Sequence, residues 1–196
     1  MNVFALCTGR CGSTSFIRAA AHISNYTSEH ESRVTLIGDA RLDYPANHIE
    51  ADNRLTWMLG RLDERYGCNA FYVHLTRDAD ATARSFDKRW KLKHGIISAY
   101  RDGILSGAEG ERMAFCTDYV ATANANIRAF LKDKPLRMDF AAETALQDWP
   151  VFWARIGAKG DLTASLKEWS VRHNATADQP SLFRRGVRAA KRFLPS

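Results

Sequence analysis

Short apolar runs alternate along this chain with segments in which apolar residues recur every three or four positions. The runs Val3–Cys7 and Ala70–Arg77 are typical of buried strands, whereas the wider spacing is typical of helices packed on a core. We expect strands at these two runs, near Tyr26, at His48–Ala51 and at Leu136–Met138, with an unassigned segment around Val34–Ile37. We expect helices at Ser13–His22, Asn53–Tyr66, Asp80–Lys93, Gly95–Leu105 and Asp118–Lys132, and two more that begin at Asp148 and Asp161.

Strands that alternate with helices predict an α/β fold, a three-layer sandwich whose central parallel sheet is flanked by helices. The chain has 196 residues, of which 45% are hydrophobic, and this suits one domain with a sizeable core. We expect that domain to span residues 1–180 and a basic tail to span residues 181–196. No apolar run approaches the roughly 20 residues of a membrane-spanning helix.

The first expected strand leads through a Gly-rich turn into the first expected helix, over Phe4–Ser15. This order is typical of a loop that holds phosphate at a helix N-terminus, as in the P-loop nucleotide hydrolases. Aligning the GxxxxGK[ST] pattern with the chain places Ser13 where the lysine belongs, and the only nearby cation is Arg10. The loop charge therefore comes from a different position than in ATPases, which favours another phosphorylated donor.

A second phosphate-binding pair is expected where the strand ending at Arg77 meets the next helix. Ligands of parallel sheets collect beyond the carboxyl ends of the strands, so Arg77 is expected to face the same crevice as the loop. Ser85 follows eight residues later on the helix and can approach that crevice. A guanidinium with a hydroxyl nearby makes a good site for an oxyanion.

Together, the two segments resemble the sulfotransferases that use 3′-phosphoadenosine 5′-phosphosulfate (PAPS) as co-substrate and release adenosine 3′,5′-bisphosphate (PAP). The resemblance implies a P-loop-like fold, a 3′-phosphate site at Arg77 and Ser85, and Arg10 in the place of the family's catalytic lysine or arginine. It implies no metal and no nucleic-acid partner. The remaining donor-binding positions that it implies belong to the 5′-phosphosulfate loop: Thr8, Gly9, Arg10, Cys11, Gly12, Ser13, Thr14 and Ser15.

Cytosolic members of that family carry a Gly-Asp stretch near the C-terminus that contacts the nucleotide. Here Gly157–Asp161 loosely resembles that stretch. The same residues also fit a glycine after one helix and an Asp cap at the start of the next.

Sulfuryl transfer needs a base beside the attacking atom, and the segment Tyr26–Arg33 is dense in suitable groups. We favour Glu31 as the base, with His30 and Glu29 as alternatives, in keeping with the His or Glu that the resemblance implies. Glu50 and Asp52 form a second pair, better suited to capping or to positioning the acceptor. The residues expected to line the acceptor pocket are Tyr44, His48, Arg54, Arg89 and Trp90.

The net charge of +6 is concentrated in residues 181–196, which hold five cations and no acid. As a helix, this tail would have an apolar stripe beside a basic face, which suits peripheral contact with the anionic inner face of a membrane. Four cysteines without metal or disulfide spacing favour the reducing cytoplasm, and the start of the chain lacks the basic region of a signal peptide.

These observations predict an enzyme that transfers a sulfuryl group from PAPS to a hydroxyl or amine, on a small-molecule or glycan acceptor such as a glycolipid. One alternative is a P-loop kinase of small molecules, although the loop lysine and an evident Mg²⁺-binding acid are both missing. Another alternative is a non-catalytic nucleotide-binding protein that docks on membranes.

Overall fold

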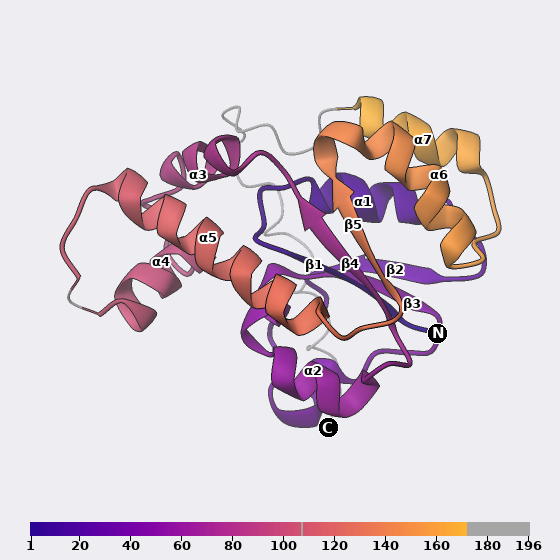
Figure 1. The fold of residues 1–196 in the computed structure, drawn as a ribbon, viewed down its shortest axis with the longest axis horizontal. Helices are drawn as coiled ribbons and strands as arrows, with labels where there is room; N and C mark the ends of the chain where they lie inside the picture. Colours follow the sequence, from indigo (N-terminus) through magenta and orange to yellow (C-terminus); the bar gives the residue numbers. More distant parts are fainter. Residues whose placement is uncertain (107, 172–196) are drawn as a thin grey trace, which may run out of the picture.

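The computed structural model describes residues 1–106 and 108–171 and shows a parallel five-stranded sheet (Figure 1). The strand order is β2-β3-β1-β4-β5, and every neighbouring pair runs parallel. The strands are β1 Val3–Cys7, β2 Thr27–His30, β3 His48–Ala51, β4 Phe71–Thr76 and β5 Arg137–Ala141. The expectation of an α/β sandwich around a parallel sheet is confirmed.

Helices cover both faces of the sheet, and β1 at its centre contributes to both cores. Val3, Ala5 and Cys7 pack on one face with α1 (Ser13–Ala20), α6 (Ala145–Arg155) and α7 (Leu162–Ser170). Phe4 and Leu6 pack on the other face with α2 (Leu59–Tyr66) and the C-terminal part of α5 (Arg112–Leu131). Successive side chains of a strand point to opposite faces, so a strand with helices on both sides is apolar at every position.

A third apolar cluster forms a lobe beyond the carboxyl ends of the strands, to the left of the sheet in Figure 1. It joins α3 (Ala79–Asp87), α4 (Ile96–Ala99) and the π-helical turn Tyr100–Ile104 to the N-terminal half of α5. Tyr119 is fully buried there, between Phe86 and Tyr100. The lobe places α3 beside the loop that follows β1.

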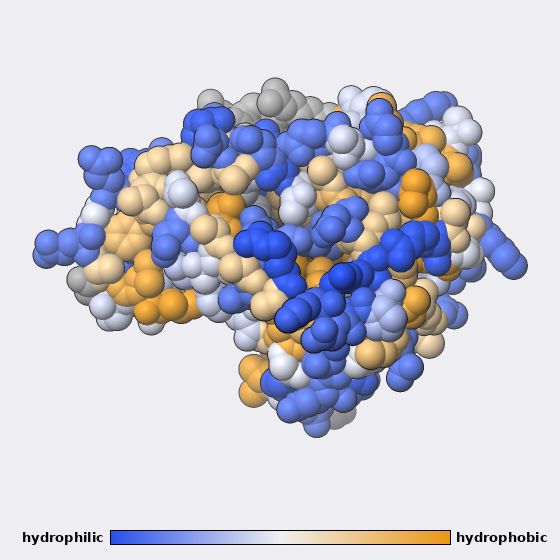
Figure 2. Space-filling model, viewed as in Figure 1, coloured by the Kyte–Doolittle hydropathy of each residue, from blue (hydrophilic) through white to orange (hydrophobic). Residues whose placement is uncertain are grey.

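The strand β5 lies at one edge of the sheet and alternates exposed and buried residues. Its exposed residues include Arg137 and Asp139, while Met138 and Phe140 point into the core. Figure 2 shows a band of hydrophilic side chains across this face of the molecule, over β5 and the adjoining end of α5. Charged side chains on an edge strand oppose pairing with another chain.

Several expected helices have different bounds in the structure. The helix expected at Asn53–Tyr66 is split into a 3₁₀ helix, Asn53–Trp57, and α2, because Met58 takes a non-helical conformation. The helix expected to reach Lys93 ends at Asp87, where the backbone bonds shorten to three-residue turns. The helix expected from Asp118 begins at Arg112.

Two further expectations concern the end of the chain and membranes. The basic tail 181–196, and the domain boundary before it, lie outside the described residues. Within the described ranges, no helix has both the length and the apolar content needed to cross a bilayer.

Candidate donor-phosphate site

The loop between β1 and α1 has a backbone shaped to hold an anion. Gly9, Arg10 and Gly12 all have positive φ angles, of 80°, 60° and 95°. Turns of this kind aim successive N–H groups into one concavity, and α1 adds the positive end of its dipole there. A Cβ on Gly9 would lie 2.6 Å from the side-chain nitrogen of Asn53. Glycine at this position is thus required both by conformation and by space.

Residues that are distant in the sequence form hydrogen bonds to the backbone of the loop. The Tyr119 hydroxyl donates to the Thr8 carbonyl over 2.7 Å, and the Asn53 amide donates to the same oxygen over 3.5 Å. Thr56 donates to the Cys7 carbonyl over 3.3 Å. These partners fix the loop before any ligand binds, which reduces the entropy cost of binding. Sequence reasoning missed Asn53 and Tyr119, since neither belongs to a local motif.

The two phosphate motifs expected from the sequence meet in the structure. The Arg10 guanidinium donates through Nε to the Ser85 hydroxyl over 2.9 Å. Arg77, which follows β4, reaches the Arg10 carbonyl through Nη1 at 3.5 Å. The loop after β1, the residue that follows β4 and the last turn of α3 therefore form one site beyond the carboxyl ends of adjacent strands.

This site is crowded with positive charge. Burial lowers the pKa of Arg10, and the nearby cations Arg89 and Arg77 lower it further. Within residues 1–106 and 108–171, neither Arg77 nor Arg89 has a carboxylate partner. Arginines gathered without such partners repel one another, and a bound anion would relieve that repulsion. A ligand with more than one phosphate fits this charge distribution.

Two of the expected loop residues turn their side chains away from the crevice. Cys11 is fully buried in the core, and its thiol is hydrogen-bonded to Cys7. That bond lowers the pKa of Cys11 and, together with burial, raises the pKa of Cys7. The Thr8 hydroxyl is buried and donates to the Gly9 carbonyl. Cys11 and Thr8 can therefore reach a donor only through their backbone, whereas Thr14 and Ser15 remain partly exposed at the start of α1.

The expected bases lie at the carboxyl end of β2, on the same side of the sheet as the loop. The His30 ring nitrogen Nε2 lies 2.9 Å from the Ser13 hydroxyl, which ties this histidine directly to the phosphate loop. Glu31 has a positive φ angle of 51° and accepts from Arg54 over 3.0 Å, with both side chains partly exposed. Glu29 is exposed on β2. His30 and Glu31 are therefore both placed beside the loop.

The second expected pair of acids is buried and fully engaged. Glu50 accepts from the backbone and the hydroxyl of Ser32, and lies 3.0 Å from His48 Nε2. Asp52 is paired with Arg41 and caps the 3₁₀ helix by accepting from the Arg54 backbone. Both carboxylates are fully buried as well as paired, whereas Glu31 is partly exposed, so neither is placed to accept a proton from an acceptor. The expectation that Asp52 acts as a cap is confirmed.

Glu29, His48 and Glu50 have ligand-type atoms within 4.8 Å of one another. His48 already contacts the Thr27 hydroxyl through Nδ1, over 2.8 Å, and Glu50 through Nε2. With Ser32 also bonded to Glu50, the residues Thr27, His48, Glu50 and Ser32 form a hydrogen-bonded network beside which Glu29 lies.

Two residues expected in the acceptor pocket are instead parts of the core. Tyr44 and His48 are only 6% and 2% exposed, and their rings stack on each other. Both follow the second strand in sequence, but their side chains point into the sheet rather than beyond it. Arg54, Arg89 and Trp90 are partly exposed, and Arg89 is close enough to Arg10 to affect its pKa.

The segment Gly157–Asp161, which loosely resembles the family's nucleotide-binding stretch, does not lie at the phosphate loop. Gly157 follows α6 with a φ of 63°, and Asp161 caps α7 by accepting from the Ala164 backbone. The segment binds the C-terminal end of α1, where Ser24 donates to the Lys159 carbonyl over 2.7 Å. The phosphate loop lies at the opposite end of α1, about 12 Å away along a helix of this length. The capping interpretation of Gly157–Asp161 is therefore the correct one.

Comparisons with known proteins show which fold this chain shares. No protein-family model matches the chain, and no curated protein sequence matches it. The sulfotransferase domain from the curacin biosynthetic pathway aligns with a TM-score of 0.60 and 14% identity, over 85% of this chain and 76% of that domain. Mouse sulfotransferase SULT7A1, crystallised with PAP, aligns with a TM-score of 0.54 and 14% identity, over 85% of this chain and 62% of the mouse chain.

The chain has the fold of the sulfotransferases. It spans less than two thirds of the mouse enzyme.

Proposed function

We propose that this protein is a sulfotransferase that uses PAPS and transfers its sulfuryl group to a hydroxyl or amine. The observation that carries the proposal is the contact between Arg10 and Ser85, with Arg77 beside them. This contact joins a 5′-phosphate loop to a 3′-phosphate pair, and PAPS carries phosphate at both of these positions. The likeness to sulfotransferase structures, one of them with PAP, supports the same conclusion.

The residues suggest how the reaction would proceed. The loop backbone binds the 5′-phosphate, and Arg77 with Ser85 binds the 3′-phosphate. As the bond between sulfur and the leaving phosphate oxygen breaks, Arg10 stabilises the charge that grows on that oxygen. Glu31 or His30 accepts the proton of the acceptor while the new bond to sulfur forms, and PAP is released.

Thermal unfolding tests the donor. We expect PAP to raise the unfolding temperature much more than ATP with Mg²⁺ does, because a ligand that binds only the folded state stabilises it by mass action. Arg77→Ala should weaken PAP binding by about 1.5–3 kcal/mol, the scale of a charge-assisted hydrogen bond. The same change should barely affect adenosine 5′-phosphosulfate, which has no 3′-phosphate.

Equal shifts with PAP and with ATP would contradict the assignment of the donor. Equal losses for both ligands in Arg77→Ala would remove Arg77 from the 3′ site. PAP binding without turnover on any acceptor would instead favour a non-catalytic nucleotide-binding protein. The cytoplasmic location and the membrane contact of residues 181–196 remain predictions from the sequence.

A further inference from the structure

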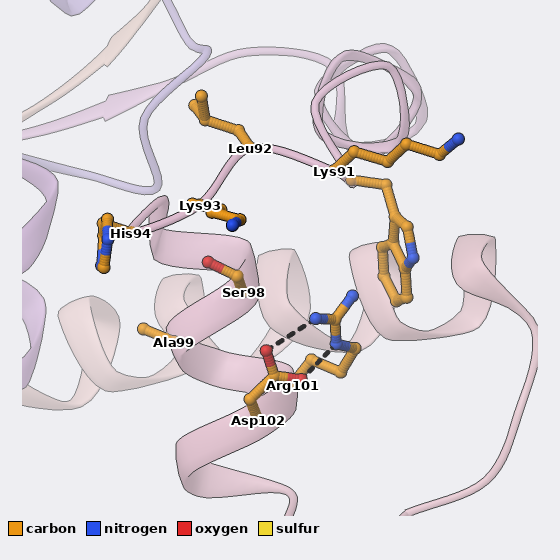
Figure 3. Close-up of a pocket in the computed structure, with 9 residues that line it drawn as sticks. Lys91, Leu92, Lys93, His94, Ser98, Ala99, Arg101 and Asp102 are labelled. Carbon is orange, nitrogen blue, oxygen red and sulfur yellow. Dashed lines mark hydrogen bonds and ion pairs between the residues drawn. The ribbon is translucent and has the colours of Figure 1, made fainter.

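A cavity of about 700 Å³ opens in the lobe, along the segment that follows α3. One wall is the segment Trp90–His94, which follows α3, and the other is formed by α4 and the π-helical turn, including Ser98, Arg101 and Asp102 (Figure 3). Pockets that bind small molecules measure about 300–1,000 Å³, so this one is large enough for a ligand of several rings.

The lining of this cavity is positively charged. Residues 88–94 hold four cations and no acid, and two of these cations, Lys91 and Lys93, line the cavity. Arg101 adds a third cation from the opposite wall. The one acid of the lining, Asp102, is bound to Arg101, so three cations and one acid leave the lining with a net charge of +2. An anionic ligand is therefore favoured over a neutral one.

Arg101 is held in place before any ligand binds. Its guanidinium lies 4.5 Å from the centre of the Trp90 ring, and its Nη2 donates to Asp102 over 2.6 Å. Figure 3 shows the Arg101 guanidinium facing the Asp102 carboxylate. Nη1 takes part in neither bond to Asp102. A cation fixed in this way loses little entropy when it binds an anion.

The cavity and the donor site are joined by one short stretch of chain. Ser85 contacts Arg10, Arg89 influences the pKa of Arg10, and Trp90 begins the wall of the cavity. Only four residues lie between Ser85 and Trp90, so their Cα atoms are at most about 18 Å apart even if the chain is fully extended. A saccharide of a few rings that binds in the cavity could therefore reach the donor site.

We propose that this cavity, lined by Lys91, Lys93 and Arg101, binds the acid groups of an acidic saccharide, which is the sulfuryl acceptor. The proposal rests on the proposed function, because a sulfuryl acceptor must carry a hydroxyl or amine. Several separated cations match a chain of carboxylates better than a single anion, and sugar rings supply hydroxyls next to those carboxylates.

Direct binding without PAPS tests the proposal. The probes are a hyaluronan tetrasaccharide, which carries carboxylates, and chitotetraose, a neutral tetrasaccharide of similar size, compared by calorimetry at low salt. We expect only the acidic probe to bind, and to bind more weakly as salt rises. Lys93→Glu should weaken this binding at least about tenfold. Lys88→Glu makes the same charge change outside the cavity and should weaken it less than about twofold.

Three outcomes would overturn the proposal: equal binding of both tetrasaccharides, equal losses in the two lysine variants, or equally tight binding of a thymidine oligonucleotide. PAP binding is measured on the same variants and should not change in Lys93→Glu. Failure of PAP to bind would count against the proposed function and not against the saccharide site. Normal PAP binding without selective saccharide binding would count against the saccharide site alone.

Discussion

Arg10 illustrates how a single residue can serve two parts of a site. Its backbone belongs to the phosphate loop, while its side chain reaches across to Ser85 on α3. Burial and, after it, the nearby cations Arg89 and Arg77 lower its pKa. Under the proposed function, a bound phosphate would favour the charged form of Arg10, and the gain would increase as charge builds on the leaving oxygen.

Substitutions of single residues can identify the base that accepts the proton of the acceptor. Glu31→Gln should lower kcat by about 10²–10⁴-fold with unchanged PAP affinity, because it removes the proton acceptor and keeps the shape. His30→Gln should instead weaken PAP binding, because His30 contacts Ser13 of the phosphate loop. Steady-state kinetics and PAP titration separate the two effects.

Glu29→Gln is the matched control for this prediction, since Glu29 is exposed on β2 and should tolerate the change. Retention of kcat in Glu31→Gln, together with its loss in His30→Gln, would transfer the role of base to His30.

At the scale of the element, the conformation of the loop between β1 and α1 depends on glycine. Gly9→Ala should reduce the free energy of unfolding by about 1–3 kcal/mol, because the new Cβ meets Asn53 and the φ angle is left-handed. Gly60→Ala is the control, since Gly60 lies in α2 with nothing within 4 Å of the added atom. It should raise stability by about 0.5–1 kcal/mol.

Denaturant unfolding measures both changes, and PAP titration shows whether Gly9→Ala also disturbs the site. Equal stability of the two variants would mean that the loop relaxes around a side chain at position 9.

The elements that the sequence predicted well are those with the simplest patterns. Val3–Cys7 and His48–Ala51 are strands with the expected bounds, because apolar runs between polar turns leave few alternatives. The start of α5 was predicted six residues too late, because its first residue follows Glu111, whose side chain makes no capping bond. Local pattern predicts an element where its ends carry a chemical signal, and fails where tertiary packing determines them.

Some parts of the candidate site could also be predicted from the sequence, and others could not. The loop and the Arg77–Ser85 pair were predictable, because each lies within one short segment. The contacts from Tyr119 and Asn53 to Thr8 were not predictable, since they join residues that are distant in sequence. The burial of Tyr44 and His48 was also missed, because spacing alone does not show which way a loop residue turns.

At the scale of the whole molecule, most of the net positive charge belongs to the end of the chain. Without the five cations of residues 181–196, the net charge of +6 falls to +1. Long-range attraction to an anionic surface would therefore depend on this tail. Recognition of the donor and the acceptor would depend on the folded domain. The two functions should be separable by mutation.

Removal of residues 181–196 should abolish sedimentation with vesicles that contain phosphatidylserine, while PAP still stabilises the shortened protein. Each cation near such a surface contributes about 1 kcal/mol, and the attraction should fade as salt rises. A full-length variant tests charge separately from apolar contact, with glutamine at the five cationic positions, Arg184, Arg185, Arg188, Lys191 and Arg192. It should lose vesicle binding nearly as completely as the truncated protein. Vesicle binding that survives both changes, or unfolding of the truncated chain, would give the tail a structural role instead.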